Sequence, residues 1–231
     1  MARSRVYDRR KILEQAEQAQ RRGQTRKAIR LYRWVLGVEH NNPQLHARLA
    51  PLLARNGEHF DAWVSYRRCA ETALREKREE RALALYRDAT RALPHEVEAW
   101  QTLAHLLVRR GDSREALAVL LEGSEGFKKR HQQAAAIYLL RRARAIDPWQ
   151  ADCVLALVRR LARNAQREEA LILLEGLAGR TTGTELRRVR AAQVRIDGSV
   201  GACWRWLRCV ATGGAPQTSA AAPSFHVGTG L

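Results

Sequence analysis

The chain has 231 residues, of which 45% are hydrophobic and 28% are charged. This composition excludes a compositionally disordered chain, and the length suffices for one large domain or two small ones. The formal net charge of +17 favours acidic proteins, nucleic acid or anionic lipid as partners. The alternative is that the genome's base composition favours arginine codons and that the charge has no functional role.

The first residues contain no apolar segment of a secretory signal, and no run of about 18 apolar residues follows. We therefore expect a cytoplasmic protein without a membrane span. The four cysteines form no C-x-x-C pair, which argues against a zinc or redox site. Cys69 and Cys153 fall on the apolar side of helical patterns and are expected to be buried.

Apolar residues at helical spacing, separated by short Gly, Asp or Pro breaks, predict about twelve helices and no strands. Residues 1–211 are expected to form one helical repeat domain, and the uncharged segment 212–231 a flexible tail. The predicted helices cover about 7–22, 25–39, 45–55, 59–76, 79–92, 96–110, 114–129, 132–146, 150–163, 167–178, 184–196 and 199–211.

The middle of the chain contains an internal repeat with one constant period. Leu49, Ala50, Arg55, Gly57 and Ala62 recur as Leu103, Ala104, Arg109, Gly111 and Ala116. Ala82, Leu85, Ala89 and Pro94 recur as Ala136, Leu139, Ala143 and Pro148. A third, partial copy carries Leu157, Leu161, Arg163 and Ala170. Each copy is interpreted as three antiparallel helices, and stacked copies predict a solenoid.

These positions resemble the tetratricopeptide repeat (TPR). Trp100, Leu103, Ala104, Leu107, Gly111, Ala116, Leu120 and Gly123 occupy the places of that family's pattern. The resemblance covers about residues 8–211 and implies a right-handed superhelical solenoid whose concave groove binds proteins. The 54-residue period differs from the family's 34 and resembles a bacterial variant with overlapping repeats.

The resemblance implies no catalytic residue and no cofactor. One subset of the family binds carboxylates through Lys and Asn on the first helices. The matching positions here include Ala47, Pro51, Gln101 and His105, which do not fit that pattern. His105 is nevertheless included among the candidate partner-binding residues.

Arg55, Arg109 and Arg163 share one register position near the ends of successive first helices, and the resemblance places Arg21 with them. Forked guanidinium donors in such a row would bind carboxylates or phosphates. The alternative is that each cation offsets the helix macrodipole at a helix C-terminus.

Trp204, Arg205 and Trp206 form the densest aromatic and basic cluster. Trp and Arg are frequent hot spots of protein interfaces, and an Arg between aromatics also suits exposed bases. The alternative is a hydrophobic cap at the end of the helical stack.

No histidine pair, nucleophile motif or phosphate-binding loop is present, so we expect no metal, no cofactor and no enzyme. The leading hypothesis is a scaffold or adaptor for protein partners, which the charge suggests are acidic. The alternative is a nucleic-acid-binding helical repeat that uses its basic ends. Residues 1–30 carry a net +7 and residues 180–211 a net +5.

Overall fold

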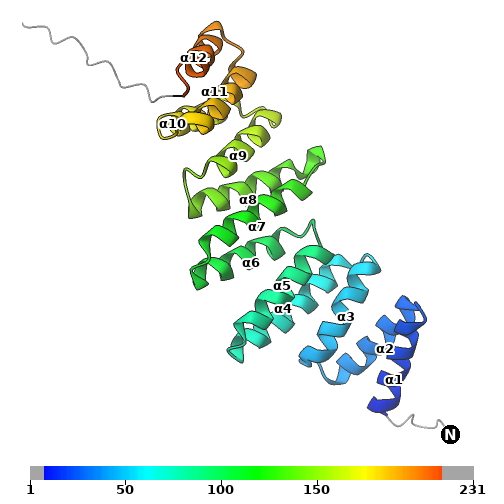
Figure 1. Cartoon of the computed structure of the whole chain (residues 1–231). Coiled ribbons are helices and arrows are strands. Elements are labelled where there is room, and N and C mark those ends of the chain that lie inside the picture. Colours follow the sequence, from blue (N-terminus) through cyan, green and yellow to red (C-terminus); the bar gives the residue numbers. More distant parts are fainter. Residues whose placement is uncertain (1–7, 215–231) are drawn as a thin grey trace, which may run out of the picture. The chain divides into compact units, whose positions relative to one another are not determined.

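The computed structural model describes residues 8–214, and all regular structure in this range is helical (Figure 1). The prediction of an all-α chain of about twelve consecutive helices is confirmed for the described residues. The helices are α1 (Arg9–Arg21), α2 (Thr25–Val38), α3 (Pro43–Arg55), α4 (His59–Arg75), α5 (Glu79–Ala92), α6 (Val97–Arg110), α7 (Ser113–Gly126), η1 (Arg130–Gln132), α8 (Gln133–Ile146), α9 (Ala151–Arg163), α10 (Arg167–Ala178), α11 (Gly183–Asp197) and α12 (Val200–Ala211).

Several helix ends follow local signals. Gly111 ends α6 in the left-handed conformation at φ 95°, as expected for a glycine after the last helical turn. At the start of α3, Pro43 occupies the first turn, and the Asn42 side chain accepts a hydrogen bond of 3.0 Å from the backbone N–H of Gln44.

The end of α7 differs from the prediction. This helix ends at Gly126 and not near residue 129. Phe127 turns inward, where it is buried with its ring centroid 5.8 Å from that of His95. The Gln133 amide then donates hydrogen bonds to the carbonyl oxygens of Lys128 and Lys129, at 3.3 and 3.1 Å. A distant hydrophobic contact therefore ends the helix early.

The sequence repeat corresponds to a three-helix module. The first helices of the three modules begin at Pro43, Val97 and Ala151, each exactly one repeat period after the one before. In the first module (α3–α5), the second (α6–α8) and the third (α9–α11), the first and third helices lie against each other, and the second packs on both. The sequence interpretation of three helices per copy is thus confirmed.

Small residues let these helices approach closely. Ala62, Ala116 and Ala170 occupy equivalent positions, and all three are fully buried. Gly123 of α7 lies directly against the indole of Trp100, and a Cβ atom at this glycine would come within 2.6 Å of the ring. Packing at native density therefore requires the smallest residue here.

Surface ion pairs link one group of helices to the next in the same register. Arg33 of α2 pairs with Glu58, which precedes α4, and with Asp61 of α4; one repeat period later Arg87 of α5 pairs with Glu115 of α7 at 2.6 Å. By this register α2 corresponds to the third helices α5 and α8, because Thr25, Glu79 and Gln133 begin these helices at the same interval.

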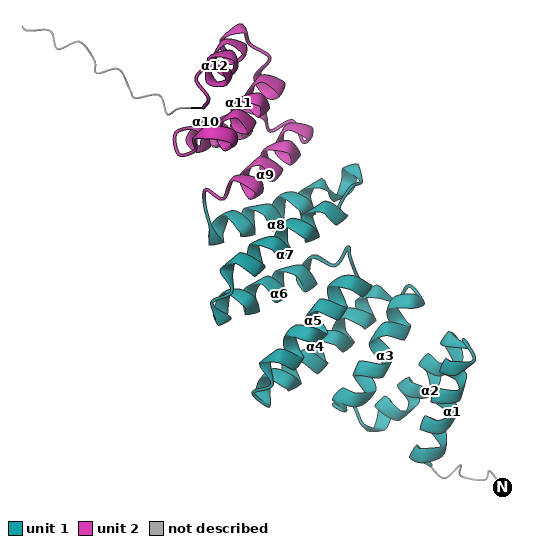
Figure 2. Ribbon diagram, viewed as in Figure 1, with its two compact units in different colours: residues 1–148 teal, residues 149–231 magenta. Residues whose placement is uncertain are grey.

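The chain divides into two compact units, residues 1–148 and 149–231 (Figure 2). Unit 1 holds α1–α8 and unit 2 holds α9–α12. One continuous repeat domain over residues 1–211 stays a prediction. Of the predicted tail 212–231, the structure describes the part up to residue 214. This part forms a turn in which the Gly183 N–H donates to the Gly214 carbonyl at 2.8 Å, and residues 215–231 lie outside the described residues.

Candidate binding groove

A groove of about 180 Å³ lies between the first and third helices of the second module. Ala104 and the buried Leu120 line it beneath the more exposed side chains. Its other lining residues are Gln101, His105 and Val108 from α6 and Arg142, Ala145 and Ile146 from α8. We call these residues, together with Tyr138 beside them, the module-2 groove.

One contact between its two walls orients two polar groups of the module-2 groove. The Tyr138 hydroxyl of α8 donates a hydrogen bond of 2.8 Å to Oε1 of Gln101 on α6. His105 and Arg142 are exposed, and neither forms an ion pair within residues 8–214. The groove thus offers imidazole, guanidinium and phenol groups to a ligand beside the apolar Val108 and Ile146.

The same register positions carry different residues in the other modules. Position 105 corresponds to Pro51 and Arg159, and position 142 corresponds to Asp88 and Ile196. Gln101 corresponds to Ala47 and Leu155, and Tyr138 to Ala84 and Ala192. The buried alanines repeat because the fold needs them, whereas the groove positions vary, and apart from the buried Leu155 their counterparts are partly or fully exposed. Such variation is what a ligand-contacting surface on a repeated frame would show.

The predicted arginines do not all have the same surroundings. Arg21, Arg55 and Arg163 are exposed at helix C-termini. Arg109 lines a second cavity of about 310 Å³, formed with Arg75, Arg110 and neighbouring residues of α4, α5 and α6. In the repeat register Arg21 corresponds to Arg75, since both end second helices. Neither Arg21 nor Arg55 lines the cavity that contains Arg109, so the structure does not gather the predicted arginines of unit 1 into one site.

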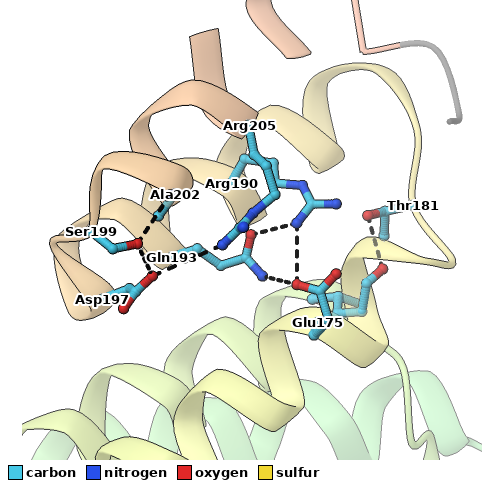
Figure 3. A network of polar contacts seen from close by, with 9 residues as sticks. Glu175, Thr181, Arg190, Gln193, Asp197, Ser199, Ala202 and Arg205 are labelled. Atoms are coloured by element: carbon cyan, nitrogen blue, oxygen red, sulfur yellow. Dashed lines mark hydrogen bonds and ion pairs between the residues drawn. The ribbon is translucent and has the colours of Figure 1, made fainter. Parts of the chain in front are cut away.

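The aromatic and basic cluster lies on α12. Trp204 is 61% exposed, Trp206 is half-buried, and the Arg208 guanidinium lies 6.0 Å from the centre of a Trp204 ring. Arg205 approaches the Asp197 carboxylate at 3.9 Å (Figure 3). The outward face of this helix is apolar and consists of Val200, Trp204, Leu207 and Val210.

On the neighbouring helix α11 a polar network shares the buried face with Leu186 and Val189. Arg190 is 8% exposed and donates to Glu175 Oε2 at 3.2 Å and to Gln193 Oε1 at 2.7 Å. The Gln193 amide donates to the same Glu175 oxygen at 2.6 Å (Figure 3). All three groups have partners inside the network, so it is a packing element and not an open site.

Tyr138 and Arg142 were missed at the level of sequence. The available signal was that Ala84 and Asp88 stand at the matching positions of the first module.

Cys69 and Cys153 are buried as expected, and burial raises the pKa of Cys69 to about 11, so its thiol stays protonated at neutral pH. Within the part of the chain that the structure describes, no group of His, Cys, Asp and Glu side chains is placed to hold a metal.

The family model for the tetratricopeptide repeat matches residues 73–135, from the end of α4 to the start of α8. Over these residues the chain is similar to tetratricopeptide repeats. This segment includes the whole of α6 and α7, and therefore the Gly123–Trp100 contact and the α6 wall of the module-2 groove. The family expected from the sequence is supported over these residues, whereas the bacterial variant stays a prediction.

Comparison with curated proteins finds no match. Among solved structures, nearly identical TPR-like repeats from Podosopora anserina share 21% identity, with 82% of this chain and 97% of that one covered and a TM-score of 0.37. A tetratricopeptide repeat protein from Parabacteroides merdae shares 13% identity over 90% and 94% of the two chains, with a TM-score of 0.32. The type IV pilus biogenesis factor PilW shares 15% identity over 88% and 92%, with a TM-score of 0.34.

No helix among the described residues combines the length and the apolar content needed to cross a membrane.

Proposed function

We propose that this chain is a non-enzymatic scaffold that binds a segment of a partner protein in the module-2 groove. The observation that carries the proposal is the pattern within the tetratricopeptide modules. Buried positions repeat from one module to the next, whereas Gln101, His105, Tyr138 and Arg142 occur together in one module only. A binding surface on a repeat frame needs this combination of constant packing and variable contact residues.

The groove chemistry favours an extended, acidic segment. Arg142 provides a forked cationic donor without an internal carboxylate partner, and His105 provides a further hydrogen-bonding group. No carboxylate lines the groove, so a partner's acidic side chain would meet no like charge there. The same absence leaves His105 without the carboxylate that would orient it for general acid–base chemistry.

The proposal is tested by affinity capture with the full chain as bait, after nuclease treatment of the native lysate. The variant His105→Ala/Arg142→Ala removes the two polar anchors without changing a buried residue. We expect it to lose a defined set of captured proteins by at least about 10-fold, which corresponds to 1.4 kcal/mol.

The matched control is Arg159→Ala, since Arg159 holds the register position of His105 in the third module and is exposed. This control should retain the captured proteins. Equal capture by the groove variant and the unchanged chain would contradict the assignment of the groove. A cytoplasmic location is part of the same proposal.

A further inference from the structure

The segment from residue 18 to residue 38 contains six basic residues and no Asp or Glu. Arg33 pairs with Glu58 and Asp61. The other five form no ion pair within residues 8–214 and are exposed; they are Arg21, Arg22, Arg26, Lys27 and Arg30. This concentration contrasts with most of unit 1, where carboxylates recur among the cations.

Three of these cations share one face of α2 with a tryptophan. Arg26, Arg30 and Trp34 follow one another at intervals of four positions, and Lys27 lies beside them. Residues at this spacing are neighbours on a helix surface, about 5–6 Å apart at Cβ. Trp34 is 48% exposed, while Tyr32 and Val35 on the other side of α2 are fully buried. We call Arg26, Lys27, Arg30 and Trp34 the α2 basic face.

The exposure of the α2 basic face does not result from the lack of a helix that would pack on it. Arg30 and Trp34 correspond in the repeat register to Ala84 and Asp88 of α5. Those two residues are exposed although the first helix of their module is present. The matching positions of α8 hold Tyr138 and Arg142, which are also exposed. This register position therefore faces solvent wherever it occurs in unit 1.

We infer that the α2 basic face binds single-stranded nucleic acid. Arg26, Lys27 and Arg30 would contact successive phosphates, and the indole of Trp34 would stack on a base. The indole is accessible to a base, because Trp34 is 48% exposed.

Charge and shape favour a nucleic acid over an acidic protein. Protein interfaces draw their affinity from apolar side chains that fill pockets, and neither of the two cavities described above includes a residue of α2. Binding to a phosphate backbone needs exposed cations and no pocket, since it is driven by counterion release. The register position of Trp34 holds Asp88 on α5 and Arg142 on α8, so neither of these helices repeats the α2 basic face.

The test measures the affinity of the full chain for a fluorescent 12-nucleotide oligouridine by anisotropy at several salt concentrations. The variant Arg26→Gln/Lys27→Gln/Arg30→Gln should weaken binding at least about 10-fold at low salt and reduce the slope of log affinity against log salt by about 2. The control Lys128→Gln/Lys129→Gln/Arg130→Gln removes the same charge from an exposed corner of unit 1 and should leave the slope unchanged.

Trp34→Ala separates stacking from general electrostatic attraction. It should weaken binding by at least about 5-fold without changing the salt slope, and Trp34→Phe should restore part of the loss. Equal losses in the face variant and the corner control would overturn the inference, because net charge alone would then explain binding. Equal affinity for duplex DNA, or for polyglutamate with the same dependence on Trp34, would overturn it in favour of another polyanion.

Discussion

The third helix of a module is built differently in the two units. In unit 1, Ala82 of α5 and Ala136 of α8 are fully buried at equivalent positions. In unit 2 the corresponding residue of α11 is Arg190, which is also buried but bonded to Glu175 and Gln193. Gln193 likewise stands where the earlier copies have Leu85 and Leu139.

This difference explains why the repeat fades in its third copy. The backbone places a helix in the same position of the module, but the side chains that hold it there change from small and apolar to polar and hydrogen-bonded. A buried arginine is tolerated because the Glu175 carboxylate and the Gln193 amide oxygen accept hydrogen bonds from its Nη1 group. The positions of the helices within a module are therefore more regular than the side-chain contacts that hold them.

The largest effect is expected when the buried arginine of unit 2 is introduced at the matching alanine of unit 1. Ala136→Arg would force a guanidinium into a fully buried site between packed helices, with neither Glu175 nor Gln193 to receive it. We expect a loss of about 4 kcal/mol or more in the free energy of unfolding. Urea titration followed by circular dichroism measures this loss.

The control is Ala134→Arg, at an exposed position earlier on α8, which should change stability by less than about 0.5 kcal/mol. If both variants unfolded at the same urea concentration, the α8 site would have room for a buried arginine, and the contrast with α11 would be wrong.

The reverse change in unit 2 should have a smaller effect. Arg190→Ala leaves the Gln193 oxygen without its donor and opens space in the core of unit 2, whereas the Glu175 side chain is 63% exposed and regains water. We expect a loss of about 1–3 kcal/mol. Hydrogen exchange of peptides from α10, α11 and α12, read by mass spectrometry, localises this loss.

Arg195→Ala is the matched control on α11, because Arg195 is exposed and has no ion pair within residues 8–214. Unchanged protection of α11 in the Arg190 variant would show that the network does not stabilise unit 2.

The smallest expected effect is a difference in alkaline sensitivity. Burial raises the pKa of Tyr66 and of Tyr86 to about 12, with nearby carboxylates adding to the shift, and unit 2 contains no tyrosine. Below pH 10 both states keep these protons. Between pH 10 and 12 the unfolded chain releases them first, so the stability of unit 1 should fall as the pH rises.

This fall is measured as the change in urea midpoint between pH 8 and pH 11. Tyr66→Phe/Tyr86→Phe removes the two ionisable hydroxyls and should reduce the fall. If the double variant lost as much stability at pH 11 as the unchanged chain, tyrosine ionisation would not be its cause.

Local signals in the sequence determined most of the helical framework. Glycine, proline and N-capping residues mark where several helices begin or end, and the regular recurrence of small residues identifies three copies of one module. Cys69, Cys153 and the repeated alanines could be assigned to the core because helical periodicity places them on the apolar face. These features depend on residues within one or two helical turns.

Tertiary structure alone decided which exposed positions meet. Gln101 and Tyr138 are far apart in the sequence and join only because α6 and α8 pack side by side. Phe127 ends α7 early because its ring is buried beside His95, and Arg190 is buried because a carboxylate from α10 reaches it. Helix propensity is local, whereas these contacts depend on how helices pack against one another, so the sequence predicted the helices but not the groove between them.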